Sequence, residues 1–126
     1  MTQSILSVDD SAIIRRIIGG TVDVLGYDFK EAVNGAEALK VLESHYQDIS
    51  LILLDWNMPV MDGYSALTHI RSDSRFQHIP VVMVTTEGEK EKIVMALRAG
   101  ANEYLCKPFS QEDLMARMVE CMAAAV

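Results

Sequence analysis

Short apolar segments alternate with longer segments of helical periodicity along the whole chain. The apolar segments, residues 5–8, 27–32, 49–54, 80–84 and 103–106, each predict a β-strand. Segment 27–32 is the most polar of them, which is typical of a strand at the edge of a sheet. Segment 49–54 is almost continuously apolar, so we expect a strand that is covered on both faces.

Helical segments follow each of these strands, and polar residues mark where several of them begin and end. Ser11, Asn34 and Ser110 stand where an N-cap residue belongs, while Gly26 and Gly100 stand where helices end. Five strand-helix units in succession predict an α/β fold with a parallel sheet, right-handed crossovers and helices on both faces. A length of 126 residues fits one domain that spans residues 1–126.

Charge and cysteine content narrow the classes of function. Eleven Lys and Arg stand against 18 Asp and Glu, a net charge of −7. This balance argues against nucleic acid as a partner, because phosphate backbones select basic surfaces. Cys106 and Cys121 have no metal-ligand spacing and are expected to be buried free thiols. Because the sequence also shows no signal-peptide pattern and no apolar stretch of membrane-spanning length, we expect a cytoplasmic protein that does not associate with membranes.

Polar side chains follow four of the predicted strands. Asp9 and Asp10 come after the first strand, Asp55 after the third, Thr85 after the fourth and Lys107 after the fifth. In a parallel sheet these positions gather beyond the carboxyl ends of the strands. Crowded carboxylates repel one another and favour a bound cation, for which Mg²⁺ is suited by its preference for oxygen ligands. An ionised aspartate can attack phosphorus, with a lysine and a hydroxyl group to stabilise the phosphoryl oxygens.

These residues and their neighbours resemble the receiver domain of two-component response regulators. The resemblance covers essentially the whole chain and is strongest to the stand-alone chemotaxis type (CheY-like). It rests on Asp9-Asp10, on residues 53–59 and 61–63, on Thr85 and on residues 107–109. It implies a flavodoxin-like (βα)5 three-layer sandwich whose five-stranded parallel sheet has the order 2-1-3-4-5.

The resemblance also implies the chemistry of the site. Asp55 would be the phosphoacceptor, and Lys107 would contact the phosphoryl group. Asp10, Asp55 and the backbone carbonyl of Asn57 would bind Mg²⁺, with Mn²⁺ as a substitute ion, and Asp9 would take part through a water molecule.

The resemblance also implies residues that would change conformation on phosphorylation and residues that would set the rate of dephosphorylation. Thr85 would be the switch hydroxyl that moves toward the phosphoryl group, and Tyr104 the switch aromatic whose ring then moves from an outward to an inward position. Asn57 and Glu87, two residues after the phosphoacceptor and the switch hydroxyl, would tune dephosphorylation. Both are polar, which predicts a phosphorylated form that lasts seconds to minutes.

The last two helical segments carry more apolar side chains than the core requires, which predicts a surface for a partner protein. The side chains assigned to the core are Leu114, Met118 and Cys121 on the last helix and Val94 and Leu97 on the helix at 89–99. The predicted partner surface consists of Ile93, Tyr104, Met115 and Met122.

The expected function is therefore signalling. A sensor histidine kinase would donate a phosphoryl group to Asp55, the protein would catalyse only its own phosphorylation and dephosphorylation, and the phosphorylated form would bind a downstream protein. The flagellar motor switch is one candidate target, and a role as a phosphorelay intermediate is the alternative. The sequence ends soon after the last predicted helix, so we expect no DNA-binding output domain, and we expect a monomer.

A magnesium-dependent phosphohydrolase with an aspartate nucleophile is the rival class of function. Such enzymes generally need a second aspartate two residues after the nucleophile, and here that position is Asn57, whose amide cannot transfer protons. A nucleotide-binding domain is also disfavoured, because neither a GxxxxGK[ST] nor a GxGxxG motif is present.

Overall fold

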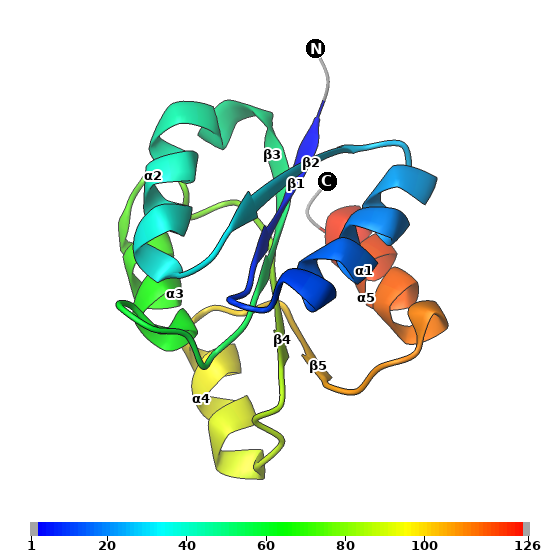
Figure 1. Cartoon of the computed structure of the whole chain (residues 1–126). Coiled ribbons are helices and arrows are strands. Elements are labelled where there is room, and N and C mark those ends of the chain that lie inside the picture. The colour runs from blue at the N-terminus through cyan, green and yellow to red at the C-terminus, as the bar shows by residue number, and fades with distance from the viewer. Residues whose placement is uncertain (1–2, 125–126) are drawn as a thin grey trace.

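A five-stranded parallel sheet runs through the centre of the molecule, in a computed structural model that describes residues 3–124 (Figure 1). The strand order is β2-β1-β3-β4-β5, as the family resemblance implied. The strands are β1 (Ser4–Val8), β2 (Asp28–Ala32), β3 (Ile49–Leu54), β4 (Val81–Thr85) and β5 (Glu103–Cys106). The helices are α1 (Ala12–Val24), α2 (Gly35–His45), α3 (Gly63–Ser72), α4 (Lys90–Ala99) and α5 (Gln111–Ala124), with a 3₁₀ turn, η1 (Tyr46–Asp48), before β3.

Helices cover both faces of the sheet, so the molecule has three layers and two hydrophobic cores. Figure 1 shows α1 and α5 on one side and α2 and α3 on the other. On β3, Leu51 and Leu53 belong to the core beneath α1 and α5, whereas Ile52 and Leu54 belong to the opposite core. All four are at most 1% exposed, which explains why this strand is continuously apolar.

The helix ends follow the polar residues that the sequence analysis singled out. Ser11, Asn34 and Ser110 each accept a hydrogen bond from the backbone N–H three residues further on, as N-cap residues do. Asp62 caps α3 in the same way, which the sequence analysis did not predict. Gly100 ends α4 with a left-handed backbone (φ +116°), a conformation that glycine adopts without steric cost.

Close packing brings α1 against the edge strand β2. A Cβ atom added at Gly19 would lie 3.1 Å from Cε2 of Phe29, so the absence of a side chain lets the aromatic ring approach the helix. A Cβ atom at Gly20 would meet nothing within 4 Å. Only the first glycine of this pair is therefore needed for the contact between α1 and β2.

The face that α4 turns toward the core differs from the prediction. Leu97, which the pattern assigned to the core, is 44% exposed, whereas Ala96 is completely buried. Val94 and Ile93 are both half-buried. The helix therefore turns Ala96 toward the core and Leu97 toward solvent.

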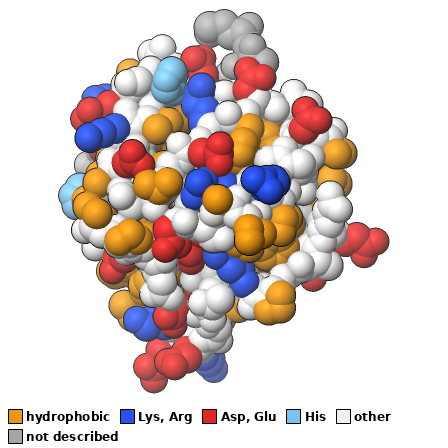
Figure 2. All heavy atoms as spheres, viewed as in Figure 1, with side chains coloured by type: hydrophobic (Ala, Val, Ile, Leu, Met, Phe, Trp, Pro, Cys, Tyr) orange, Lys and Arg blue, Asp and Glu red, His pale blue; other side chains and the backbone are white. Residues whose placement is uncertain are grey.

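Figure 2 shows one face of the molecule in space-filling form, where acidic and basic side chains are interspersed with hydrophobic ones. Large exposed hydrophobic side chains include Ile13 and Ile17 on α1, at 70% and 47%, and Val60 at 86%. Among residues 3–124, none of the helices combines the length and hydrophobicity needed to cross a membrane.

Candidate functional site

The carboxyl ends of the strands bring the predicted site residues together. β1 and β3 are neighbours, with Val8 and Leu54 in register, so Asp9 and Asp55 lie next to each other directly after these pairs. Thr85 ends β4 and is completely buried, while Asp9 and Asp55 are only 2% and 6% exposed. The hydrophobic strands thus place two carboxylates and a hydroxyl group at the same largely buried edge of the sheet.

Three carboxylates form an acidic cluster with the composition of a metal site. One oxygen each of Asp9, Asp10 and Asp55 lies within 4.8 Å of the others, and Asp10 is the exposed member. Carboxylate oxygens are hard ligands that suit a small divalent cation. The donor set therefore fits Mg²⁺, and the exposed carboxylate leaves the cluster open to solvent on one side.

The ammonium group of Lys107 joins two of these carboxylates. Its Nζ lies 2.7 Å from Oδ2 of Asp9 and 3.2 Å from Oδ2 of Asp55, and the lysine side chain is only 13% exposed. The peptide bond between Lys107 and Pro108 is cis. From the end of β5 the lysine side chain therefore reaches across the site to both carboxylates.

Burial and charge act against each other on this pair. Burial raises the pKa of the Asp9 carboxyl, although the hydrogen bond from Lys107 opposes the rise. Burial alone would lower the pKa of Lys107, but its hydrogen bond with Asp9 and the negative charges of Asp55 and Asp9 outweigh that effect, and the pKa is raised. A lysine held in its charged form supplies the positive charge that crowded carboxylates need.

The loop after β3 holds the carboxylate of Asp55 from its other side. The backbone N–H of Trp56 donates a 2.7 Å hydrogen bond to Oδ1 of Asp55. Gly63, the first residue of α3, lies so close that an added Cβ atom would be 1.9 Å from the backbone oxygen of Asp55. Between them, Val60 has a left-handed backbone (φ 68°), which is unfavourable for a β-branched residue. The loop is therefore tightly folded against the end of β3.

Trp56 also contacts helix α4. Its indole is 5% exposed and stacks on the ring of Tyr64, with centroids 5.4 Å apart and an interplanar angle of 17°. Nζ of Lys92 lies 4.8 Å from the centre of the Trp56 ring, within the range of a cation–π interaction. The sequence analysis did not single out Lys92, because the charged first turn of a helix carries no signal that distinguishes it from an ordinary solvated turn.

Glu87 connects the predicted switch and tuning residues. Its carboxylate accepts a 3.0 Å hydrogen bond from the amide of Asn57, and its backbone N–H donates to Oγ1 of Thr85 over 3.3 Å. Its backbone carbonyl accepts a hydrogen bond from the hydroxyl group of Tyr104. Burial, followed by the nearby Cys106, raises the pKa of Tyr104 to about 12. The loop after β4 therefore joins all four residues.

The ring of Tyr104 lies beside the loop that follows β4. It is half-buried, packs against the core shared by α2, α3 and α4, and is held by its hydrogen bond to Glu87. The loop carbonyl supplies this partner within the protein, and movement of the ring on phosphorylation stays a prediction. The prediction did not foresee this bond, because a backbone carbonyl leaves no trace in the sequence.

The predicted partner surface is only partly assembled. Tyr104 lies on β5, against which both α4 and α5 pack, and Ile93 and Met115 are half-buried on those helices. Met122 lies apart from them, because it shares a cavity with Leu25 and Tyr27 on the side of α5 that faces α1. The core assignments on α5 are confirmed, since Leu114, Met118 and Cys121 are at most 3% exposed. Cys106, at the end of β5, is exposed, so the expectation of two buried thiols was wrong for this residue.

Comparison with known proteins identifies the class to which this fold and site belong. The family model of the response regulator receiver domain matches residues 5–119. The chain therefore belongs to the response regulator receiver domain family. Within that family it is a CheY-like member: it is 45% identical to chemotaxis protein CheY1 of Helicobacter pylori over 115 residues, which cover 90% of this chain and 92% of the relative.

Solved structures agree with this assignment. The chemotaxis protein CheY4 of Vibrio cholerae superimposes with a TM-score of 0.87 at 33% identity, covering 96% of this chain and 99% of that one. CheY in the CheX–CheY–BeF3–Mg²⁺ complex from Borrelia burgdorferi gives a TM-score of 0.89 at 26% identity, covering 94% and 87%. The predicted flavodoxin-like fold is confirmed. CheY-like receivers are signalling proteins, and receiver domains generally bind Mg²⁺ at an acidic site.

Proposed function

We propose that this protein is a cytoplasmic chemotaxis regulator that accepts a phosphoryl group on Asp55 from a sensor histidine kinase and then binds a downstream protein. The observation that carries the proposal is the position of Lys107, whose ammonium group spans Asp9 and Asp55 beside the exposed carboxylate of Asp10. The similarity to CheY1 of Helicobacter pylori supports chemotaxis as the pathway. The phosphohydrolase alternative is not favoured.

The acidic cluster supports a role for Mg²⁺ in this reaction. The residues that would hold the ion are Asp10, Asp55 and the backbone carbonyl of Asn57, with Asp9 acting through a water molecule. Mn²⁺ would substitute because it also accepts oxygen ligands. When bound, the ion supplies positive charge that offsets the repulsion among the carboxylates and the phosphoryl oxygens.

The side chains of the protein itself account for the transfer step. A carboxylate oxygen of Asp55 attacks the phosphorus atom of a phosphohistidine, so that a P–O bond forms while the P–N bond breaks and the imidazole leaves with its electron pair. The backbone N–H of Trp56 orients the carboxylate. Lys107 would release part of its contact with Asp55 and neutralise a phosphoryl oxygen, and the hydroxyl group of Thr85 would donate to another.

Dephosphorylation of Asp55 would involve the pair formed by Asn57 and Glu87. Their hydrogen-bonded side chains present an amide and a carboxylate beside the phosphoacceptor. Such groups can hold a water molecule for attack on phosphorus, which favours a phosphorylated form that lasts seconds to minutes. The protein would catalyse only these two reactions on itself.

The phosphorylated form would act through the region around β5. Movement of Thr85 toward the phosphoryl group would displace Glu87, whose backbone N–H donates to the Thr85 hydroxyl. Glu87 would in turn displace Tyr104, whose hydroxyl group donates to the Glu87 carbonyl. This would remodel the surface that includes Ile93 and Met115. The complex of the Borrelia burgdorferi CheY with CheX supports a protein as the partner, and a protein of the flagellar motor switch is a candidate. We further propose that the free protein is a monomer.

The experiment that tests the proposal compares two aspartate variants. With acetyl phosphate or a phosphorylated histidine kinase and Mg²⁺, the parent protein should become labelled with ³²P, and Asp55→Asn should not. Asp23→Asn, on the exposed surface of α1, is the matched control and should be labelled like the parent. Undiminished Mg²⁺-dependent labelling of Asp55→Asn would exclude this residue as the phosphoacceptor.

A further inference from the structure

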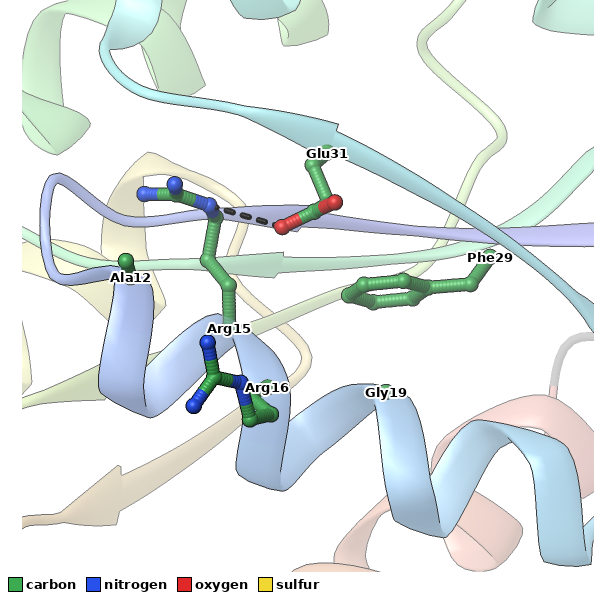
Figure 3. Close-up of a pocket in the computed structure, with 6 residues that line it drawn as sticks. All are labelled: Ala12, Arg15, Arg16, Gly19, Phe29 and Glu31. Atoms are coloured by element: carbon green, nitrogen blue, oxygen red, sulfur yellow. Dashed lines mark hydrogen bonds and ion pairs between the residues drawn. The ribbon is translucent and has the colours of Figure 1, made fainter.

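Arg15 on α1 connects the acidic cluster to the edge strand β2. Nη1 of Arg15 donates a 2.5 Å hydrogen bond to the backbone carbonyl of Asp9, and Nε donates a 2.9 Å hydrogen bond to the carboxylate of Glu31. The arginine side chain is only 14% exposed, whereas that of Glu31 is 50% exposed. Figure 3 shows Arg15 reaching from the helix to Glu31, while none of the drawn contacts involves its neighbour Arg16.

The contact with Asp9 bears directly on Asp10. The other polar groups of Asp9 already have partners: its N–H donates to Ala32 of β2, and its carboxylate oxygens accept from Ser11 and Lys107. The carbonyl that Arg15 holds belongs to the peptide group that links Asp9 to Asp10. Because a peptide group is planar, fixing its oxygen also fixes the direction in which the chain enters Asp10.

Glu31 determines where the guanidinium group of Arg15 lies. The planar guanidinium group presents several N–H donors in a fixed arrangement, so one side chain can serve the carboxylate and the carbonyl at the same time, which a lysine cannot do. The close approach of α1 to β2 at Gly19 and Phe29 brings the helix within reach. A cavity of about 400 Å³ between α1 and β2 is lined by both members of the ion pair.

We propose that Arg15, aimed by Glu31, is a positioning residue for the metal site, because it sets the peptide group that directs the exposed carboxylate of Asp10 into the cluster. The inference deepens the proposed function and rests on it. In this arrangement Arg15 acts through the backbone between Asp9 and Asp10, by its hydrogen bond to the carbonyl of Asp9.

The test measures Mg²⁺ affinity by calorimetry together with the amide resonance of Asp10 in the metal-free protein. Arg15→Gln should raise the dissociation constant for Mg²⁺ about tenfold, the lower end of the loss seen when a residue that orients a metal ligand is removed. It should also shift the Asp10 amide resonance. Glu31→Gln, which keeps an acceptor but loses the charge, should have a smaller effect of the same kind. Arg16→Gln is the matched control and should leave both measurements unchanged.

Two outcomes separate the possible failures. If Arg15→Gln lowers the midpoint of thermal unfolding but leaves the Mg²⁺ dissociation constant and the Asp10 resonance unchanged, Arg15 only ties α1 to β2 and the inference is wrong. If the parent protein and Asp10→Ala bind Mg²⁺ equally, or neither binds it, the metal site of the proposed function fails instead, and the inference fails with it.

Discussion

The amide of Asn57 and the carboxylate of Glu87 are joined by a 3.0 Å hydrogen bond, although 30 residues separate them in the chain. The bond links the loop that follows the proposed phosphoacceptor to the loop that follows Thr85. The family resemblance implied a role in dephosphorylation for both residues, because they stand two positions after Asp55 and Thr85. Because of this bond, movement of either side chain removes a hydrogen-bond partner from the other.

The first prediction concerns the lifetime of the phosphorylated form. Glu87→Ala and Asn57→Ala should each lengthen the half-life of ³²P-labelled protein severalfold, because each removes a group that can hold the attacking water. The double variant should show less than the combined effect of the two single changes, since the residues act as a pair. Glu89→Ala, on an exposed position nearby, is the control. A parent protein that keeps its label overnight with Mg²⁺ would contradict the prediction.

The second prediction concerns the acidic cluster. Asp10→Ala should weaken Mg²⁺ binding by more than the roughly tenfold loss typical of removing a residue that merely orients a ligand. In metal-free buffer the same variant should unfold at a higher temperature than the parent, because one of three mutually repelling carboxylates is gone. Thermal unfolding with EDTA and with excess Mg²⁺ measures both effects. Equal midpoints for variant and parent under both conditions would refute them.

The third prediction concerns backbone strain in the loop after β3. Val60 has φ 68° and is 86% exposed, so its side chain offers little packing in return for an unfavourable conformation. Val60→Asn should stabilise the protein by about 1 kcal/mol, the lower end of the cost of a left-handed residue. Urea unfolding measures the change. Val60→Ala removes the β-branch but cannot form the local side-chain hydrogen bond that asparagine can, so it should gain less. The absence of any gain in both variants would rule out strain as the cause.

The fourth prediction concerns Tyr104 at high pH. Its pKa is raised to about 12 by burial, whereas an unfolded tyrosine has a pKa of about 10. Between these values the unfolded state loses a proton that the native state keeps, so the free energy of unfolding falls as the pH rises through this window. Tyr104→Phe should remove this part of the decline. Absorbance at 295 nm should show one tyrosine fewer titrating near pH 12 in the variant, and an unchanged titration curve would contradict the assignment.

The architecture could be predicted from the sequence because the apolar segments and the polar residues that follow them both indicated a parallel sheet. The continuous apolar run of β3 requires a strand that is covered on both faces, and the residues directly after the strands had to meet at one edge. This places Asp9, Asp55 and Lys107 together before any coordinates are known. The strand order itself came from the family resemblance, since alternation of strands and helices is compatible with more than one order.

Contacts made by flexible or backbone groups could not be predicted in this way. Arg15 and Arg16 are adjacent and chemically identical, so the sequence does not reveal that Arg15 is the one that reaches Asp9. The core face of α4 was misjudged because the larger Leu97 was assigned to it, whereas Ala96 is the residue that is buried there. Met122 was placed with the partner surface by its spacing, but α5 turns it toward Leu25.

The contact between Gly63 and Asp55 has a consequence for how this molecule can vary. A Cβ atom at position 63 would overlap the backbone oxygen of Asp55, at 1.9 Å, and backbone cannot be moved aside as a flexible side chain can. In a library of random variants selected for folded protein, position 63 should retain glycine alone, while the neighbouring Val60 accepts many substitutions. Substitutions in this loop should therefore accumulate at its exposed tip. The distance between the end of β3 and the start of α3 should stay constant among the folded variants.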